Sequence, residues 1–131
     1  MQIVARSRNI RISPRKMRLV VDSIRHLGLA EIRLVLSNIN KRAAKPILLT
    51  FKQAMANATN NFKLNEEDLR LKEIQVGKGP TYKRWRAVSR GRGRSILKRT
   101  SHIRIVLEGE KSKPIEKLVK KKRKEKLKNR I

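Results

Sequence analysis

Apolar residues near the start of the chain change from an alternating spacing to a helical one. Ile10 and Ile12 alternate with polar residues in the segment NIRIS, which predicts a short strand. Ser13 and Pro14 then suit the N-cap and the first position of a helix, where the missing N–H of proline is no loss. Gly28 is a natural stop for this helix. Its apolar face is formed by Met17, Val20, Val21, Ile24 and Leu27.

The helical spacing recurs twice more in the first half of the chain. Ile32, Val35 and Leu36 predict a second helix that ends near the segment SNIN. The third helix is expected to end at Asn60 and Asn61, and Pro46 leaves two alternatives, a start at this residue or a kink in the first turns. Its apolar stripe is interpreted as core, and consists of Ala44, Ile47, Leu48, Phe51, Ala54, Met55 and Ala58.

The segment DLRLKEIQV has the alternation of a β-strand, but with a change of phase. Leu69 and Leu71 fall in one phase, whereas Ile74 and Val76 fall in the other. A β-bulge near residues 72 and 73 would reconcile the two phases.

A second strand is predicted in HIRIVLEG, where Ile103, Ile105 and Leu107 share one face. Because two strands flank one long connection, they indicate a long β-hairpin rather than a loose loop. The predicted fold class is α+β: three helices packed on a small three-stranded antiparallel sheet, with a long protruding β-hairpin and a basic C-terminal tail.

The charge of the chain indicates a polyanionic partner. The 131 residues include 36 Lys and Arg against 10 Asp and Glu, a formal net charge of +26. Self-repulsion on this scale works against a compact free state. Residues 19–77 hold nine basic and six acidic residues, whereas residues 78–104 hold ten basic and no acidic ones. The middle of the chain therefore resembles an ordinary domain, while the segments around it are specialised.

Composition also excludes several classes of protein. The chain has no cysteine, which excludes disulfides and thiolate-ligated metals. Its apolar runs are too short for a transmembrane helix, and the N-terminus lacks the apolar segment of a secretory signal. We therefore expect a soluble, intracellular protein with no membrane partner, no metal and no cofactor.

The connection between the two strands, residues 79–103, is a candidate RNA-binding arm. It holds eight Lys and Arg and no acidic residue, and connections of this length are usually functional or disordered. The basic side chains would neutralise phosphates, the glycines would let the backbone approach closely, and Tyr82 and Trp85 would stack on bases. The alternative is a solvated surface with Trp85 tucked against the core.

The segment SPRKMR is a second candidate site. Arg15, Lys16 and Arg18 occupy the first turns of the predicted helix, although that end of a helix favours acidic side chains. A bound phosphate would reverse this conflict, since free backbone N–H groups and basic side chains would converge on it. The alternative is that these side chains point to solvent.

Few residues suggest catalysis. His26 and His102 have no sequence partner that would make a metal site or a nucleophile–base pair. The acidic residues 66–68 are better explained by a turn that leads into a strand. GKGPT and GRGR lack the spacing of phosphate-binding and dinucleotide motifs. No enzymatic role and no small-molecule substrate are predicted.

Four blocks together carry a family resemblance. IRISPRKMRLVVDSIR, AMANATNN, LKEIQVGKGPTYKR and GRGRSILKRTSHI follow one another in an order and spacing that closely resemble large-subunit ribosomal protein twenty-two of the bacterial type. The resemblance covers about residues 4–108. It implies a globular ribosomal RNA-binding domain over residues 1–110, with a β-hairpin at about 76–101 that lines the nascent-peptide exit tunnel beside ribosomal protein four. Residues 111–131 form a basic tail, to which charge alone assigns extra RNA anchoring.

The resemblance and the charge pattern together define the predicted contacts. Where the family often has Pro-Arg-Ala this chain has Ala87, Val88 and Ser89, and Arg94 stands where an acidic residue is common. The residues expected at the tunnel-facing tip are Ser89, Arg90, Gly91, Arg92, Gly93 and Arg94. The predicted RNA-binding residues are Arg6, Arg8, Arg11, Ser13, Arg15, Lys16, Arg18, Lys78, Tyr82, Lys83, Arg84, Trp85, Arg86, Arg90, Arg92, Arg94, Lys98, Arg99, Ser101 and His102.

The leading hypothesis is a structural constituent of the large ribosomal subunit. Its implied partners are large-subunit ribosomal RNA, neighbouring large-subunit proteins including ribosomal protein four, and transiently the nascent peptide. An architectural DNA-binding protein is the alternative, although the arm offers Gly and Arg at its tip rather than an apolar wedge. A third hypothesis, a membrane-active cationic tail, rests on an apolar face that is too short for strong insertion.

Overall fold

The computed structural model describes residues 1–109, which form three helices and a three-stranded antiparallel sheet. The predicted α+β class is confirmed, whereas the tail predicted at 111–131 lies outside the described residues. In chain order the elements are β1 (Gln2–Ile10), α1 (Pro14–Ile24), α2 (Leu29–Asn38), α3 (Ala44–Ala56), β2 (Leu69–Ala87) and β3 (Gly93–Gly109).

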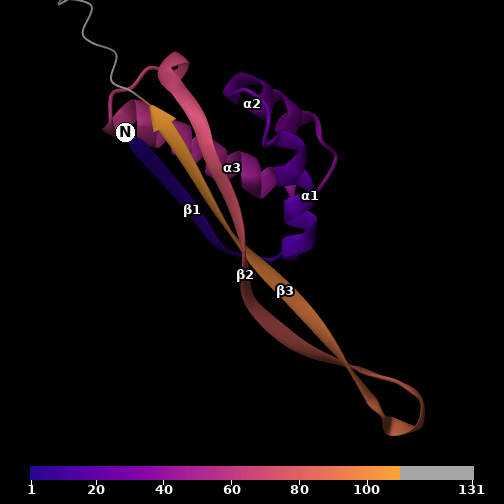
Figure 1. Cartoon of the computed structure of the whole chain (residues 1–131). Coiled ribbons are helices and arrows are strands. Elements are labelled where there is room, and N and C mark those ends of the chain that lie inside the picture. Colours follow the sequence, from indigo (N-terminus) through magenta and orange to yellow (C-terminus); the bar gives the residue numbers. More distant parts are fainter. Residues whose placement is uncertain (110–131) are drawn as a thin grey trace, which may run out of the picture.

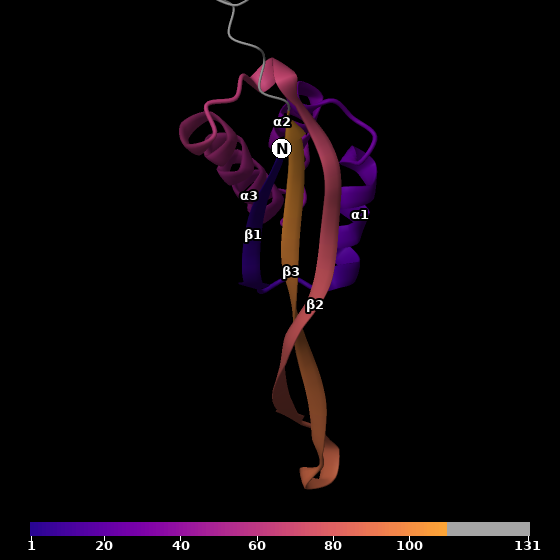
Figure 2. The same cartoon turned by 60° about the vertical axis from the view of Figure 1, so that its left-hand side comes forward.

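The helices cover one face of the sheet. The strand order is β1-β3-β2, so β3 is central. Helix α1 packs on β2 and β3, α3 packs on β1 and β3, and α2 packs on α3 (Figures 1 and 2). Ile103, Ile105 and Leu107 of β3 are buried in this core on a single face, as predicted. The opposite face of the sheet, which we call the outer face, carries the alternate residues of each strand.

The first strand begins earlier than predicted. The strand predicted at NIRIS is wrong in position, because β1 runs from Gln2 to Ile10 and buries Ile3 and Ala5. These two residues are opposite Leu107 and Ile105 of the central strand, so pairing with β3 determines where β1 lies along the chain. The pairing becomes irregular between Ser7 and Ile10, and Ile12 lies beyond the strand.

Helix α1 begins as predicted but ends earlier. It starts at Pro14 after Ser13, which has the extended conformation of an N-cap but makes no capping hydrogen bond with its side chain. It ends at Ile24, so the stop predicted at Gly28 is wrong. Gly28 is instead the N-cap of α2, where its N–H donates to the carboxylate of Glu31 at 3.2 Å. Gly28 therefore marks the start of α2 rather than the end of α1.

Helix α3 does not start at Pro46, so that alternative is wrong. The helix begins at Ala44, so the proline lies in the first turn, where its missing N–H leaves no intrahelical acceptor unpaired. Thr50 Oγ1 donates to the Pro46 carbonyl at 2.9 Å, one turn later. A π-helical turn over Asn57–Asn61 follows α3, so the helical segment ends at the asparagines predicted to terminate it.

Strand β2 has the predicted bulge. Its pairing with β3 shifts register between Leu71 and Glu73, and a short 3-10 turn at Glu66–Asp68 leads into the strand. Beyond Pro80 and Arg99, β2 and β3 extend away from the helices as an antiparallel pair that reaches Ala87 and Gly93 (Figure 1). We call residues 80–99, which are all exposed, the arm. A turn at Ser89–Gly91 closes it, with positive φ angles at Arg90 and Gly91.

Candidate nucleic-acid interface

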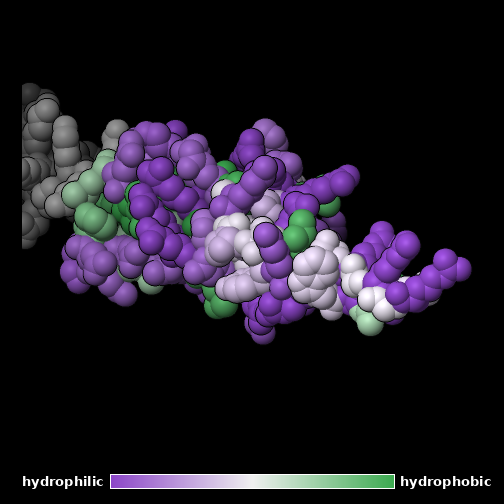
Figure 3. Space-filling view, turned by 90° about the horizontal axis from the view of Figure 1, so that it is seen from below, coloured by the Kyte–Doolittle hydropathy of each residue, from purple (hydrophilic) through white to green (hydrophobic). Residues whose placement is uncertain are grey.

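The arm presents one sign of charge on every side. Residues 80–99 contain eight Lys and Arg and no Asp or Glu, and none of them is buried. Seen from below, the projecting part of the molecule is dominated by hydrophilic side chains (Figure 3). Because no described residue of the arm packs into the core, its strands depend on their mutual pairing and on whatever neutralises their charge.

The two aromatic side chains of the arm lie outside the core. Trp85 is 72% exposed, so the alternative in which it is tucked against the core is wrong. Tyr82 is 40% exposed, and the guanidinium carbon of Arg11 lies 5.6 Å from its ring centroid, within cation–π range. Trp85 is therefore free to stack on a base, whereas Tyr82 joins the arm to the loop before α1.

Two hydrogen bonds hold the root of the arm, where the strands are also closely packed. Thr100 Oγ1 donates to the Pro80 carbonyl at 2.6 Å, across the two strands. A second register shift, between Lys78 and Thr81, lies at the same level. Gly79 has no room for a side chain, because an added Cβ would collide with Thr100 Oγ1. Arg18 Nη2 donates to the Val76 carbonyl at 3.2 Å, which ties α1 to β2.

The predicted phosphate site coincides with a hollow between α1 and the arm root. The hollow has a volume of about 450 Å³ and brings together the side chains of Arg15, Arg18, Lys78 and Arg99 with no acidic residue. The N–H groups of residues 15 and 16 lie in the first turn of α1, where a helix has no internal acceptors for them. This arrangement fits an oxyanion at the helix end.

Lys16 lies on the other side of the same helix end. It lines a separate hollow of about 400 Å³ together with Arg11, Lys41 and Arg42. The start of α1 therefore has basic side chains on both sides. Arg15, Lys16 and Arg18 are all exposed, so the interpretation that they point to solvent stays open beside that of a phosphate site. Lys41 and Arg42 were not predicted as contacts; their only sequence signal is that they are adjacent.

The remaining predicted residues divide into exposed and buried positions. Arg6 and Arg8 are exposed on β1. His102 is half-buried, and its Nδ1 accepts a 3.0 Å hydrogen bond from the Asn9 N–H. Ser101 is completely buried, so its hydroxyl does not reach the surface from which RNA would approach. The alternation of the strand could have predicted this burial, because Ser101 is in the same phase as Ile103 and Ile105.

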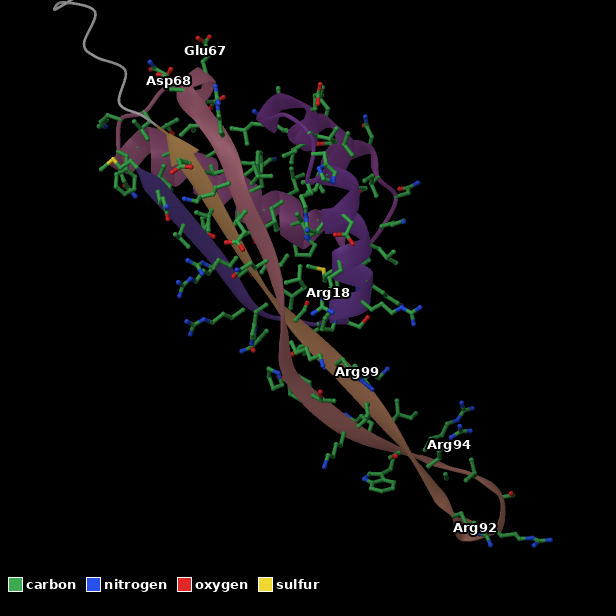
Figure 4. All side chains as sticks on the ribbon, in the orientation of Figure 1. Arg18, Glu67, Asp68, Arg92, Arg94 and Arg99 are labelled. Carbon is green, nitrogen blue, oxygen red and sulfur yellow. The ribbon has the colours of Figure 1, made fainter. Side chains whose placement is uncertain are left out.

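The acidic turn Glu66–Asp68 lies at the end of the molecule farthest from the arm tip. Figure 4 shows Glu67 and Asp68 at one end and Arg92 at the other. Next to the acidic turn, a groove of about 800 Å³ runs between α2 and α3, and its lining includes Leu34, Met55 and Glu67. The arm therefore holds basic side chains with no acid among them, whereas the opposite end of the described structure holds both signs of charge.

Other chemistry is not apparent in the described part of the chain. Residues 1–109 contain no group of three or more His, Cys, Asp or Glu side chains placed to hold a metal ion. None of the helices described is both long enough and apolar enough to span a membrane.

Comparison with known families agrees with this geometry. The family model described as "Ribosomal protein L22p/L17e" matches residues 5–108, from β1 to the penultimate residue of β3. The chain belongs to this family. The match covers the sheet, the three helices and the whole arm, so the L22p/L17e resemblance predicted for about residues 4–108 is confirmed.

Individual relatives give the same result. A protein named large ribosomal subunit protein uL22 from Mycoplasma capricolum is 48% identical over 111 residues, which is 85% of this chain and 100% of the relative. Proteins of the same name from Syntrophus aciditrophicus and Staphylococcus aureus strain Newman are each 44% identical and cover 82% of this chain, and 98% and 92% of their own lengths. Nothing in these L22p/L17e relatives supports the architectural DNA-binding alternative.

Proposed function

We propose that this protein is a structural, non-enzymatic constituent of the cytoplasmic large ribosomal subunit and that it binds large-subunit ribosomal RNA. The observation that carries the proposal is the arm, in which residues 80–99 are all exposed and hold eight basic and no acidic side chains. The relatives of the chain are named as large-subunit ribosomal proteins, which supports a place in the large subunit. An arm of this charge fits a site enclosed by phosphates.

Affinity and specificity come from different features in this mechanism. The Lys and Arg side chains of the arm neutralise phosphates and supply affinity. Folded RNA is recognised largely by shape, and the arm offers a long, narrow shape whose direction is fixed at the root by the Thr100–Pro80 hydrogen bond. The hollow of Arg15, Arg18, Lys78 and Arg99 receives a backbone phosphate beside that root.

The tip of the arm carries the second part of the proposal. Residues 89–94 line the nascent-peptide exit tunnel beside ribosomal protein four and meet the nascent peptide transiently, as the family resemblance implies. The globular domain spans residues 1–110 and makes contacts with neighbouring large-subunit proteins, while residues 111–131 add basic charge for RNA anchoring. Two neighbouring tip residues, Arg90 and Gly91, have positive φ angles, which let the chain reverse in a short turn at the tip.

Two measurements test this function. In a sedimentation profile of a lysate that expresses the tagged full chain, the protein should travel with the large subunit and not at the top of the gradient. Purified protein should also bind a large-subunit RNA fragment more tightly than random RNA or duplex DNA at physiological salt. Equal affinity for all three nucleic acids would remove the claim of specificity, and bending of duplex DNA would favour the architectural alternative.

A further inference from the structure

We propose that the outer face of the sheet carries a second phosphate-binding site, built on Arg6 and Arg104 and specific for an RNA phosphodiester. The proposal rests on the RNA-binding function above and adds to it a face that neither the arm nor the start of α1 supplies. Its starting observation is that Arg6 of β1 and Arg104 of β3 are direct partners in the antiparallel register.

The alternation of the strands places both arginines on the outer face. On β3, Ile103 and Ile105 are buried in the core beneath the helices, so Arg104 between them points the other way. On β1, Ala5 is buried in the same core, and Arg6 is exposed on the opposite side. The three helices pack on the core face, so none of them separates the two arginines from a ligand that approaches the outer face.

Two like charges at directly opposite positions destabilise an antiparallel pair. Within residues 1–109 neither arginine has an ion-pair partner, since the salt bridges there join Arg25 to Asp22 and Lys72 to Glu108. The closest acidic residue along β2 is Glu73, which instead accepts a 2.6 Å hydrogen bond from Gln75. The protein therefore places two cations side by side and directs no carboxylate at them.

The other end of the same face shows what a compensated arrangement looks like. There Arg70 of β2 is opposite Glu108 of β3, and the Lys72 ammonium lies 3.4 Å from the Glu108 carboxylate. At that end, Glu108 compensates the charge of the neighbouring basic residues. The Arg6–Arg104 pair lies four residues nearer the arm along β3 and lacks this acid, so its charge is available to an external anion.

Arg104 also has an unused donor. Its Nε is buried and has no hydrogen-bond partner among the described residues. An unsatisfied buried donor on a charged group is costly, and arginine binds phosphate best through two parallel N–H donors. A phosphate oxygen reached by a small rotation of the long side chain would supply the acceptor that the protein does not provide.

His102 adds a neutral donor to the same face. It lies two residues before Arg104 on β3, and its Nδ1 already accepts a hydrogen bond from the backbone of Asn9. The neutral ring must then carry its proton on Nε2, which leaves an N–H for a ligand oxygen. A flat face with donors from two strands suits an extended polyanion better than a small free anion, which would need an enclosing pocket.

The site is tested with Arg104→Gln and Arg6→Gln in the full chain, with Arg33→Gln on α2 as a charge-matched control. Affinity for a large-subunit RNA fragment is measured over a range of salt concentrations. Each outer-face variant should reduce the slope of log affinity against log salt by about 0.7–0.9, the value for one lost phosphate contact. The control, which lines the groove beside Glu66 and Glu67, should leave the slope unchanged.

Thermal unfolding of the free protein gives a second, independent readout. Removing one of these two like charges should leave the melting temperature unchanged or raise it, and an added large-subunit RNA fragment should stabilise the wild type more than Arg104→Gln. An unaltered salt slope together with a lower melting temperature would overturn the site and make Arg104 a structural residue. If the wild type fails to prefer the ribosomal fragment, the proposed function fails, but the slopes on random RNA still decide the Arg6–Arg104 site.

Discussion

Thr100 Oγ1 donates a hydrogen bond of 2.6 Å to the carbonyl oxygen of Pro80, at the point where β2 and β3 leave the helices. Proline has no N–H to give to the strand pairing, and the register shifts at this level between Lys78 and Thr81. The side chain of Thr100 therefore replaces part of a missing backbone ladder. Thr100 is buried whereas Pro80 and Arg99 are exposed, so this part-buried bond lies at the boundary between the core and the arm.

Replacing this threonine tests how strongly the root depends on it. Thr100→Val keeps the shape of the side chain and removes the donor, so the free energy of unfolding should fall by about 0.5–1.5 kcal/mol. Urea unfolding of the full chain measures the change. Thr81→Val, at an exposed position of the arm, is the matched control and should change stability by less than about 0.5 kcal/mol. Equal effects in the two variants would mean that the Thr100 bond does not stabilise the root.

Gly79 should be intolerant of any side chain. A Cβ there would collide with Thr100 Oγ1 and lie 3.1 Å from His102 Cε1, so either the strand or the Thr100 hydrogen bond must shift. Gly79→Ala should cost about 1–3 kcal/mol of unfolding free energy, in the range of overpacked sites. Gly93→Ala is the control, because its Cβ would meet only Trp85 at an ordinary 3.5 Å. A melting temperature for Gly79→Ala no lower than that of Gly93→Ala would contradict the prediction.

Local patterns predicted the parts of the fold that depend on local spacing. The apolar face of α1 and the phase change near Lys72 can be read from the sequence, because buried residues repeat with the period of the helix or strand that carries them. The position of β1 was missed because Ile10 and Ile12 alternate as well as Ile3 and Ala5 do. Only pairing with Ile105 and Leu107, about a hundred residues later, distinguishes the two.

The candidate interface shows the same division. The charge of the arm could be predicted from the sequence alone, because the segment contains no acidic residue whose position could change the result. The root could not be predicted, since the Thr100–Pro80 bond and the crowding at Gly79 depend on the register between distant strands. Arg104 was overlooked for this reason: it occupies an ordinary polar position of a strand until Arg6 is placed opposite it.

Trp85 should matter for binding and not for folding. Its side chain is 72% exposed, so Trp85→Ala should change the free energy of unfolding by less than about 0.5 kcal/mol. If its ring stacks on a base, the same change should weaken binding to a large-subunit RNA fragment by about 1–3 kcal/mol. Val88→Ala, an exposed apolar residue near the tip, is the control and removes no stacking surface. Equal affinities for the two variants would assign Trp85 to the arm's own packing.

Charges at the tip should act on RNA binding through salt dependence. Arg92 and Arg94 are exposed and have no salt bridge among the described residues, so changing both to Gln should not lower the stability of the free protein. If each contacts one phosphate, the double variant should reduce the slope of log affinity against log salt by about 1.4–1.8.

The control for the tip is Arg33→Gln combined with Lys52→Gln, which removes the same charge from the groove between α2 and α3. A general effect of net charge would change the slope equally in both double variants, because counterions respond to the total charge when no contact is specific. A local effect would change it only at the tip. The difference between the two slopes therefore separates an arm enclosed by RNA from a protein that is merely cationic.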